Sequence, residues 1–333
     1  MSLKSKATHF INNVYVTSRA TCVGPDENKG PLSEYFDVYF DDYYCHQKTF
    51  EKAEREMQKI AINTCLQKAK LKIEDIDLLI GGDLTNQITA SSYTATNFNI
   101  PYIGIYSACS SSCLSIAIAS LLIESNQFES VLTFVSSHNA TAERQYRYPV
   151  EYGIQKPETT TFTATGAGAI LLSNQPSNIK IESLTLGRSI DYKQTNVNDM
   201  GRAMAPAAYE TLKQHFKDTN RSFEDYDLVV TGDLSNYGKT ILETMFNKEG
   251  IKTSSYNDCG VMLYDISKQE VFQGGSGCAC SALVTYGYIL EMLAKKKFKR
   301  VLIVATGALM SPITTMQKEN IPSIAHAISI EGV

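Results

Sequence analysis

The sequence predicts an α/β protein made of two related halves, in which parallel-rich sheets are covered by helices. The first observation is a repeated block: residues 74–86 read EDIDLLIGGDLTN and residues 224–236 read EDYDLVVTGDLSN. Each copy has an acidic lead-in, an apolar run and a Gly-Asp turn, and no gap is needed to align them. An uninterrupted apolar run is typical of a strand whose two faces are both covered.

A second repeat extends the first. Residues 102–135 and residues 275–304 each contain a turn of small residues with cysteine, then a helical stretch, then an apolar strand. Strands that alternate with helices predict parallel sheets covered by helices. We therefore expect a pseudo-dyad that brings the two cysteine turns face to face, with residues 1–178 forming one half and residues 179–333 the other.

Composition limits the possible functions. The chain is 43% hydrophobic and 20% charged, which is ordinary for a globular protein, and its net charge of -4 gives no reason to expect nucleic acid. Eight cysteines follow no small-domain disulfide framework, which predicts a reducing compartment. Residues 1–8 lack the apolar core of a signal peptide, and the longest apolar stretch, near Leu114–Ile123, is far shorter than a membrane span. Any membrane association should therefore be peripheral.

One basic run stands out at Lys295, Lys296, Lys297, Lys299 and Arg300. The commoner explanation is a helix C-terminus, where cations meet the negative end of the helix dipole. The alternative is a surface patch that attracts anionic lipid.

The turn around Cys109, which includes Ser107 and Ser110, lies between a predicted strand and a helix N-terminus. Free N–H groups and the helix dipole favour the thiolate there, and they also favour bound carboxylates. Cys109 is accordingly a nucleophile, the wall of an anion pocket, or a small residue that fits a tight turn.

Residues 136–148 directly follow the strand at 130–135, where an open parallel sheet presents its ligand side. This predicts Ser137, His138, Asn139 and Arg144 near that edge. Arg144 suits a bidentate carboxylate contact. The alternative for Arg144 is an internal ion pair with Glu143 or Glu151, and a lone histidine is usually structural.

Other motifs point away from cofactors. The stretch FTATGAGAILL at 162–172 enters a strand but lacks the lysine and helix of a phosphate loop. Cys278 and Cys280 have only Cys259 as an obvious additional metal ligand, so we expect no metal and no cofactor. The aromatic and acidic run at 35–44 is interpreted as packing over the core, or alternatively as an interface or flap.

The doubled layout, the SAC turn and the TGAGAILL strand resemble ketoacyl synthases and thiolases, of the thiolase-like superfamily. Longer stretches resemble the stage V sporulation protein AD family of spore-forming bacteria: GPLSEYFD, SSHNATAERQYRYPVEYG, DMGRAMAPAAYETLKQH, NDCGVMLYD and VFQGGSGCACSA. This resemblance covers residues 24 to 326. It implies a thiolase-like fold, usually a homodimer, that binds dipicolinic acid with or without calcium. It also implies a role in dipicolinate uptake into the developing spore and release at germination. The other stage V sporulation channel proteins are the implied partners, at a peripheral location on the spore inner membrane.

Departures from the enzyme relatives affect catalysis. Condensing enzymes of the ketoacyl synthase III type use Cys, His and Asn; Cys109 matches the first, but Asp233 stands at the histidine position and the turn Gly275-Ser276-Gly277-Cys278 lacks the asparagine. Losing one donor to an oxyanion costs about 10²–10³ in rate. We therefore expect binding without turnover. The alternatives are an active acyltransferase with Cys109 as nucleophile and an adaptor with an empty pocket. The expected ligand-binding residues are Ser107, Cys109, Ser110, Ser137, His138, Asn139, Arg144, Asp233, Asn236, Gly275, Ser276, Cys278 and His326.

Overall fold

The computed structural model describes residues 7–146 and 156–333. Its first half contributes β1 (Thr8–Phe10), β2 (Tyr15–Val23), β3 (Val38–Tyr39), α1 (Phe50–Ala69), β4 (Leu78–Gly82), α2 (Thr89–Ala95), β5 (Tyr102–Gly104), α3 (Ser111–Glu124), β6 (Ser130–Ser137), α4 (Asn139–Tyr146), β7 (Phe162–Thr163) and β8 (Gly166–Ser173). The second half contributes β9 (Ile179–Thr185), α5 (Met200–Thr219), β10 (Leu228–Thr231), α6 (Ser235–Asn247), β11 (Tyr256–Asp258), α7 (Cys259–Leu263), β12 (Gly275–Ser276), α8 (Cys278–Leu283), η7 (Val284–Ile289), α9 (Leu290–Ala294), β13 (Arg300–Ala308), α10 (Pro312–Met316) and β14 (Ser323–Gly332).

The strand order repeats between the halves. The main sheet runs β11-β10-β13-β14-β9-β2-β8-β6-β4-β5, with β1 added on β9 and β3 on β2. In the first half β4 pairs in parallel with β5 and β6, whereas β8 pairs antiparallel with β6 and β2. The second half has the same pattern, with β10 parallel to β11 and β13 and with β14 antiparallel to β13 and β9. The predicted α/β fold with two pseudo-symmetric halves is confirmed.

The halves join in the main sheet where β9 pairs antiparallel with β1, Thr8 lying opposite Thr185, and with β2 at Tyr15 and Lys180. The predicted boundary between residues 178 and 179 falls in the connection between β8, which ends at Ser173, and β9, which begins at Ile179.

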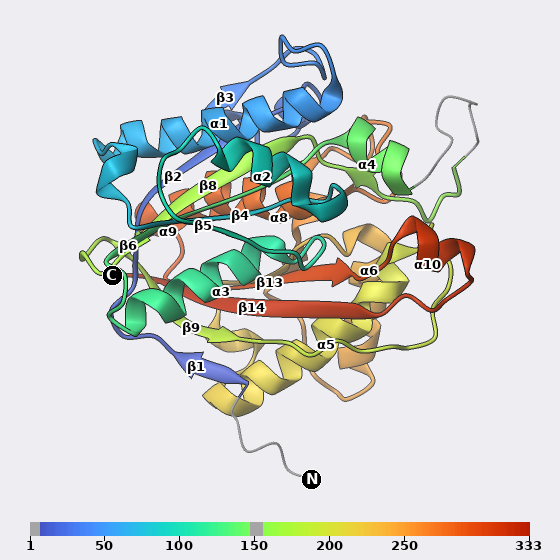
Figure 1. The fold of residues 1–333 in the computed structure, drawn as a ribbon. Helices are drawn as coiled ribbons and strands as arrows, with labels where there is room; N and C mark the ends of the chain where they lie inside the picture. Colours follow the sequence, from blue (N-terminus) through green and yellow to red (C-terminus); the bar gives the residue numbers. More distant parts are fainter. Residues whose placement is uncertain (1–6, 147–155) are drawn as a thin grey trace.

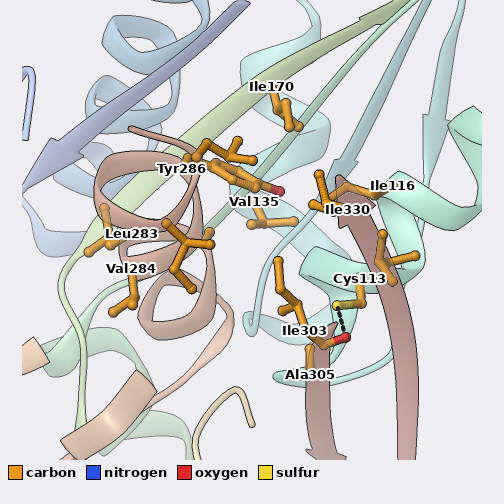
Figure 2. Close-up of a cluster of buried hydrophobic side chains, with 14 of the residues drawn as sticks. Cys113, Ile116, Val135, Ile170, Leu283, Val284, Tyr286, Ile303, Ala305 and Ile330 are labelled. Carbon is orange, nitrogen blue, oxygen red and sulfur yellow. Dashed lines mark hydrogen bonds between the residues drawn. The ribbon is translucent and has the colours of Figure 1, made fainter. Parts of the chain in front are cut away.

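A layer of helices lies between the halves (Figure 1). Helix α3 packs against β6 of its own half and against β13 and β14 of the other, while α8 packs against β6 and β8. Because α3 is apolar on nearly all sides, it is stable only when surrounded by protein. Figure 2 shows the resulting core, in which Cys113 and Ile116 of α3 approach Ile303 and Ile330 of the second half.

The predicted approach of the two cysteine turns is visible at the centre of this layer. Ser112 of α3 and Ser281 of α8 occupy matching places in the two copies, and their hydroxyls are 2.6 Å apart. Both are buried, so the two copies meet in a hydrogen bond inside the protein.

No helix in the described ranges 7–146 and 156–333 is long and apolar enough to cross a membrane. All eight cysteines are free thiols.

Candidate functional site

Cys109 lies at the tip of a tight turn that connects β5 to α3. The preceding residue, Ala108, has φ of 48°, a left-handed conformation that non-glycine residues adopt at a cost. The turn closes on itself, since the N–H groups of Ser110 and Ser111 donate to the carbonyls of Ser107 and Ala108. These two amides are therefore used inside the turn, and the expectation that the helix N-terminus offers them to a ligand is wrong for this pair.

Cys109 opens onto a pocket that is built from both halves. Its apolar walls come from five different segments of the chain: Leu84, Ala108, Ala142, Met200, Met204, Ala308 and Met310. Two tyrosines, Tyr106 and Tyr146, add aromatic surface, and the Tyr146 hydroxyl donates to the Leu84 carbonyl at 2.7 Å. Such a pocket suits a flat apolar body that carries a few polar groups.

Asp233 is the polar centre of the pocket. Its Oδ1 accepts a hydrogen bond from the Thr306 hydroxyl at 2.6 Å, and its Oδ2 accepts from the Gly277 N–H at 3.0 Å. Burial raises the pKa of this carboxyl to about 7, although the hydrogen bonds from Thr306, Cys109 and Gly277 partly oppose the rise. Asp233 is thus a neutral acid in a large part of the molecules at neutral pH.

The same environment holds Cys109 as a thiol. Burial and the nearby Asp233 carboxyl raise the pKa of the Cys109 thiol well above its ordinary value. The predicted dipole effect on this cysteine is outweighed, because removing the thiolate from water costs more than the helix end supplies.

Three further polar side chains line the pocket. Ser276 and Thr163 are largely buried, and within the described part of the chain neither hydroxyl has a hydrogen-bond partner. Glu143 is also in the wall, and the Lys156 ammonium lies 2.8 Å from its carboxylate. The two hydroxyls are therefore available to a ligand, and the Glu143 charge is compensated.

Some predicted site residues lie one layer behind the pocket. The Ser107 hydroxyl is 2.7 Å from that of Ser110 and 3.3 Å from Nε2 of His326. Nδ1 of His326 accepts from the Gly187 N–H, and burial lowers the pKa of this histidine to about 4. His326 is therefore neutral, and it supports the turn rather than lining the pocket.

Ser137, Gly275 and Cys278 are also outside the lining. The Ser137 hydroxyl donates to the Ala164 carbonyl, and the Cys278 thiol donates to the Ser136 carbonyl at 3.3 Å. Gly275 packs against Tyr264, where a Cβ would lie 2.9 Å from the ring. These three residues lie behind the pocket lining and support it.

Four predictions are wrong in their placement. His138 is buried between Tyr43 and Phe50, with Nε2 2.8 Å from the Tyr43 carbonyl. Asn139 donates from its backbone to Thr165 and from its side chain to the Thr163 carbonyl, so both groups are used structurally.

The other two are Arg144 and Asn236. Arg144 pairs with Glu51 at 2.8 Å on the opposite side of α4 from the pocket. Of the two partners proposed for Arg144, Glu143 pairs with Lys156 and Glu151 lies outside the described residues. Asn236 is exposed at the start of α6 and contacts Gln273.

Sequence reasoning missed the methionines Met200, Met204 and Met310, and also Tyr106 and Thr163. One signal was available for Met310. It follows β13 as α4 follows β6, so the internal repeat places it at the ligand edge of the second half.

The aromatic run at 35–44 lies on the surface, with Tyr39 and Tyr44 about half exposed. No group of three or more His, Cys, Asp or Glu side chains that could hold a metal occurs within residues 7–146 and 156–333.

A chemical prediction follows from the pKa of Cys109. At pH 7 to 8 iodoacetamide should alkylate Cys109 more slowly than it alkylates free cysteine, because only the thiolate reacts. Replacing Asp233 by asparagine removes a nearby acid and should speed the reaction several-fold. Peptide mass spectrometry measures both rates, with Cys109→Ala as the blank. Alkylation of the unsubstituted protein faster than free cysteine would contradict this assignment.

Comparison with known proteins agrees with the fold and adds a family. The family model for stage V sporulation protein AD matches residues 4–331. The chain is 48% identical over 333 residues to the stage V sporulation protein AD of Bacillus subtilis (strain 168), covering 99% of this chain and 98% of that protein.

Solved structures show the same architecture at low sequence identity. The 3-oxoacyl-[acyl-carrier-protein] synthase III of Aquifex aeolicus VF5 matches with a TM-score of 0.59 at 14% identity, over 96% of this chain and 99% of that one. A variant of Xanthomonas campestris OleA bound with cerulenin matches with a TM-score of 0.62 at 14% identity, over 99% and 100%. The fold is thiolase-like, and by its family match and its full-length relative the chain belongs to the stage V sporulation protein AD family.

Proposed function

We propose that this protein binds dipicolinic acid in the pocket at Cys109 and serves the spore channel complex in dipicolinate uptake and release. The family gives a sporulation role. The observation that carries the ligand proposal is the pocket itself, in which apolar and aromatic walls surround two unpartnered hydroxyls and an Asp233 carboxyl that is partly protonated near neutral pH.

The chemistry of the ligand fits these groups. Dipicolinate is a planar pyridine with two carboxylates, so it needs flat apolar walls for the ring and donors for the oxygens. Ser276 and Thr163 supply hydroxyl donors, and protonated Asp233 supplies a further O–H. Hydrogen bonds to a charged acceptor are roughly twice as strong as neutral ones, which favours these contacts.

Calorimetry tests the proposal directly. Titrating dipicolinate into the purified protein at pH 6, with and without calcium, should give saturable heat. Thr163→Val keeps the side-chain shape but loses the hydroxyl, and it should weaken binding roughly tenfold. Thr240→Val, on the exposed face of α6, is the matched control and should bind normally. Absence of heat at millimolar ligand would contradict the proposal.

The second candidate is an acyltransferase that forms a thioester on Cys109. It is favoured by the position of Cys109 in an enclosed pocket and by the fold shared with synthases. The raised pKa of Cys109 and the acid at position 233 argue against it. Mass spectrometry after incubation with acyl-coenzyme A separates the two, since an adduct that disappears in Cys109→Ala would support the enzyme.

A further inference from the structure

The two halves contain the same helix-to-strand turn with opposite chemistry. In the first half, residues 125–130 connect α3 to β6 and read SNQFES. In the second half, residues 295–300 connect α9 to β13 and read KKKFKR. We call these the neutral turn, whose one charged side chain is Glu129, and the basic turn. The repeat thus provides an internal comparison of what the fold needs and what was added to it.

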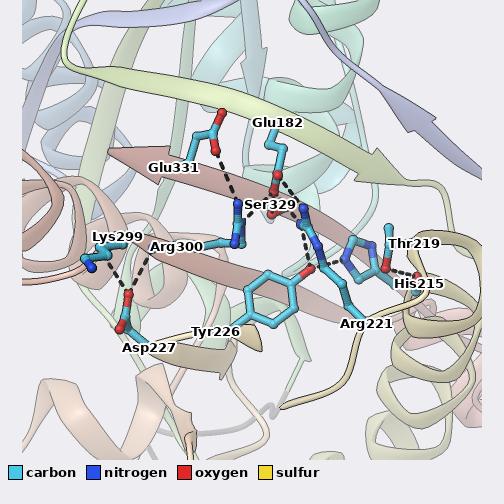
Figure 3. Close-up of polar contacts among 10 residues, drawn as sticks. All are labelled: Glu182, His215, Thr219, Arg221, Tyr226, Asp227, Lys299, Arg300, Ser329 and Glu331. Atoms are coloured by element: carbon cyan, nitrogen blue, oxygen red, sulfur yellow. Dashed lines mark hydrogen bonds and ion pairs between the residues drawn. The ribbon is translucent and has the colours of Figure 1, made fainter. Parts of the chain in front are cut away.

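The backbone of the two turns is built in the same way. In the neutral turn the Asp77 carboxylate accepts from the N–H groups of Glu129 and Ser130 at 2.8 and 2.9 Å. In the basic turn Asp227 accepts from Lys299 and Arg300 at 2.6 and 3.0 Å (Figure 3). Since the same geometry forms from SNQFES, the lysines are not required to end the helix.

One lysine even occupies an unfavourable position. Asn126 and Lys296 have matching left-handed backbones, with φ of 58° and 57°. Asparagine is enriched in this conformation, whereas lysine gains nothing from it. The backbone conformation at this position therefore does not explain the choice of lysine.

Much of the added charge is uncompensated. Lys295 pairs with Glu291 at 3.1 Å, and Arg300 lies within ion-pair distance of Glu182. The other three ammonium groups have no ion-pair partner in the described part of the chain, and all three side chains are exposed: Lys296, Lys297 and Lys299. They present positive charge to solvent on a protein whose net charge is -4.

The basic turn and the pocket lie at opposite ends of the molecule. The Gly332 N–H donates to the Lys299 carbonyl, so the turn lies beside the C-terminus marked in Figure 1. Strand β13 begins at Arg300 in this turn and ends at Ala308 in the pocket wall. Nine residues of strand span roughly 30 Å. Occupying one end therefore leaves the other open.

We infer that the basic turn docks this protein on an anionic lipid bilayer, with the pocket facing away from the membrane. Lysine ammoniums on flexible stems attract a diffuse layer of phosphates without fixed geometry. The hollow beside the turn is open and has the Glu331 carboxylate in its wall, which disfavours a dedicated site for one free phosphate. This inference extends the proposed role in the spore channel complex and does not depend on the ligand.

Vesicle flotation of the full chain tests the inference. The protein should float with vesicles of phosphatidylcholine plus phosphatidylglycerol at low salt, and should stay behind with phosphatidylcholine alone. High salt should release it, because screening shortens the range of the attraction. Each lysine at an anionic bilayer adds roughly fivefold to the affinity, so removing three should lower it roughly a hundredfold.

The neutral turn supplies the variant. Lys296→Asn, Lys297→Gln and Lys299→Glu together copy residues 126, 127 and 129, and the fold tolerates these residues in the other half. The control changes three exposed lysines elsewhere to glutamine: Lys193, Lys268 and Lys318. Equal flotation of the copied-turn variant and the unsubstituted chain would overturn the inference.

Two further outcomes are informative. A chain that ignores anionic vesicles but is retained through the basic turn on immobilised polyglutamate would overturn lipid in favour of an acidic protein partner. Dipicolinate calorimetry on the copied-turn variant should be unchanged, so a failure of the ligand proposal is seen separately.

Discussion

Replacing Asp233 by asparagine should tighten dipicolinate binding at pH 8 roughly tenfold or more. At that pH the Asp233 carboxyl, whose pKa is raised to about 7, is mostly ionised and faces a dianion. Two like charges 5 Å apart repel by about 3 kcal/mol at an effective dielectric constant of 20. Asparagine removes this repulsion and keeps an oxygen for the Thr306 hydroxyl. Isothermal calorimetry at two pH values measures the effect.

The sign of the pH dependence is fixed by the same argument. Binding favours the protonated form of Asp233, so the affinity of the unsubstituted protein should fall as pH rises through about 7. Near pH 5.5 the two proteins should bind alike. Glu27→Gln is the matched control, because burial also raises the pKa of Glu27 to about 7 but this residue is not in the pocket wall. A dipicolinate affinity that is the same at pH 5.5 and pH 8 would refute the role of Asp233.

Glu182→Ala should lower the free energy of unfolding at pH 7 by about 3 kcal/mol. The Glu182 carboxylate accepts hydrogen bonds from both terminal nitrogens of Arg221, at 2.6 Å each, and also from Arg300 and from the Ser329 hydroxyl (Figure 3). Removing the carboxylate deprives the half-buried guanidinium groups of Arg221 and Arg300 of an ion-pair partner. Urea unfolding of both proteins measures the difference, and a loss below about 1 kcal/mol would place this cluster among ordinary surface ion pairs.

Acid should erase that difference. Burial raises the pKa of Glu182, but the Arg221 and Ser329 contacts outweigh it and lower the pKa to about 2. A carboxyl with a depressed pKa stabilises the fold above its unfolded value near 4.5, and the contribution is lost as pH falls toward 2. The gap between Glu182→Ala and the unsubstituted protein should therefore narrow between pH 4.5 and 2. Glu182→Gln, which keeps the volume, should lie between them at pH 7.

The fold was largely predictable because the repeated blocks at 74–86 and 224–236 align without a gap. The apolar runs that begin at Leu78 and Leu228 became β4 and β10 at equivalent sheet positions, and the helical stretch after Cys109 became the buried α3. The pairing of β9 with β1 and β2, which joins the halves, left no comparable pattern, because these contacts involve few residues and have no sequence period.

A pocket residue was predictable only where its position in the chain by itself determines the direction of its side chain. Cys109 at a turn tip and Asp233 at a strand end have little freedom, and both line the pocket. Side chains on α4 point in directions set by the rotation of the helix, which follows from partners distant in sequence. Ala142, Glu143 and Tyr146 face the pocket, so Arg144 faces the other way.

The hydrogen bond between Ser112 and Ser281 brings together the parts of the two halves that form the pocket. The two cysteine turns meet at this hydrogen bond inside the protein. Of their two cysteines only Cys109 lines the pocket, because the Cys278 thiol donates to the Ser136 carbonyl. Neither copy carries a complete cavity, because walls from residues 84–163 close against walls from residues 200–310. A small acid bound in this pocket would therefore contact both halves of the chain and stabilise their packing against each other. Loss of the ligand would weaken that packing.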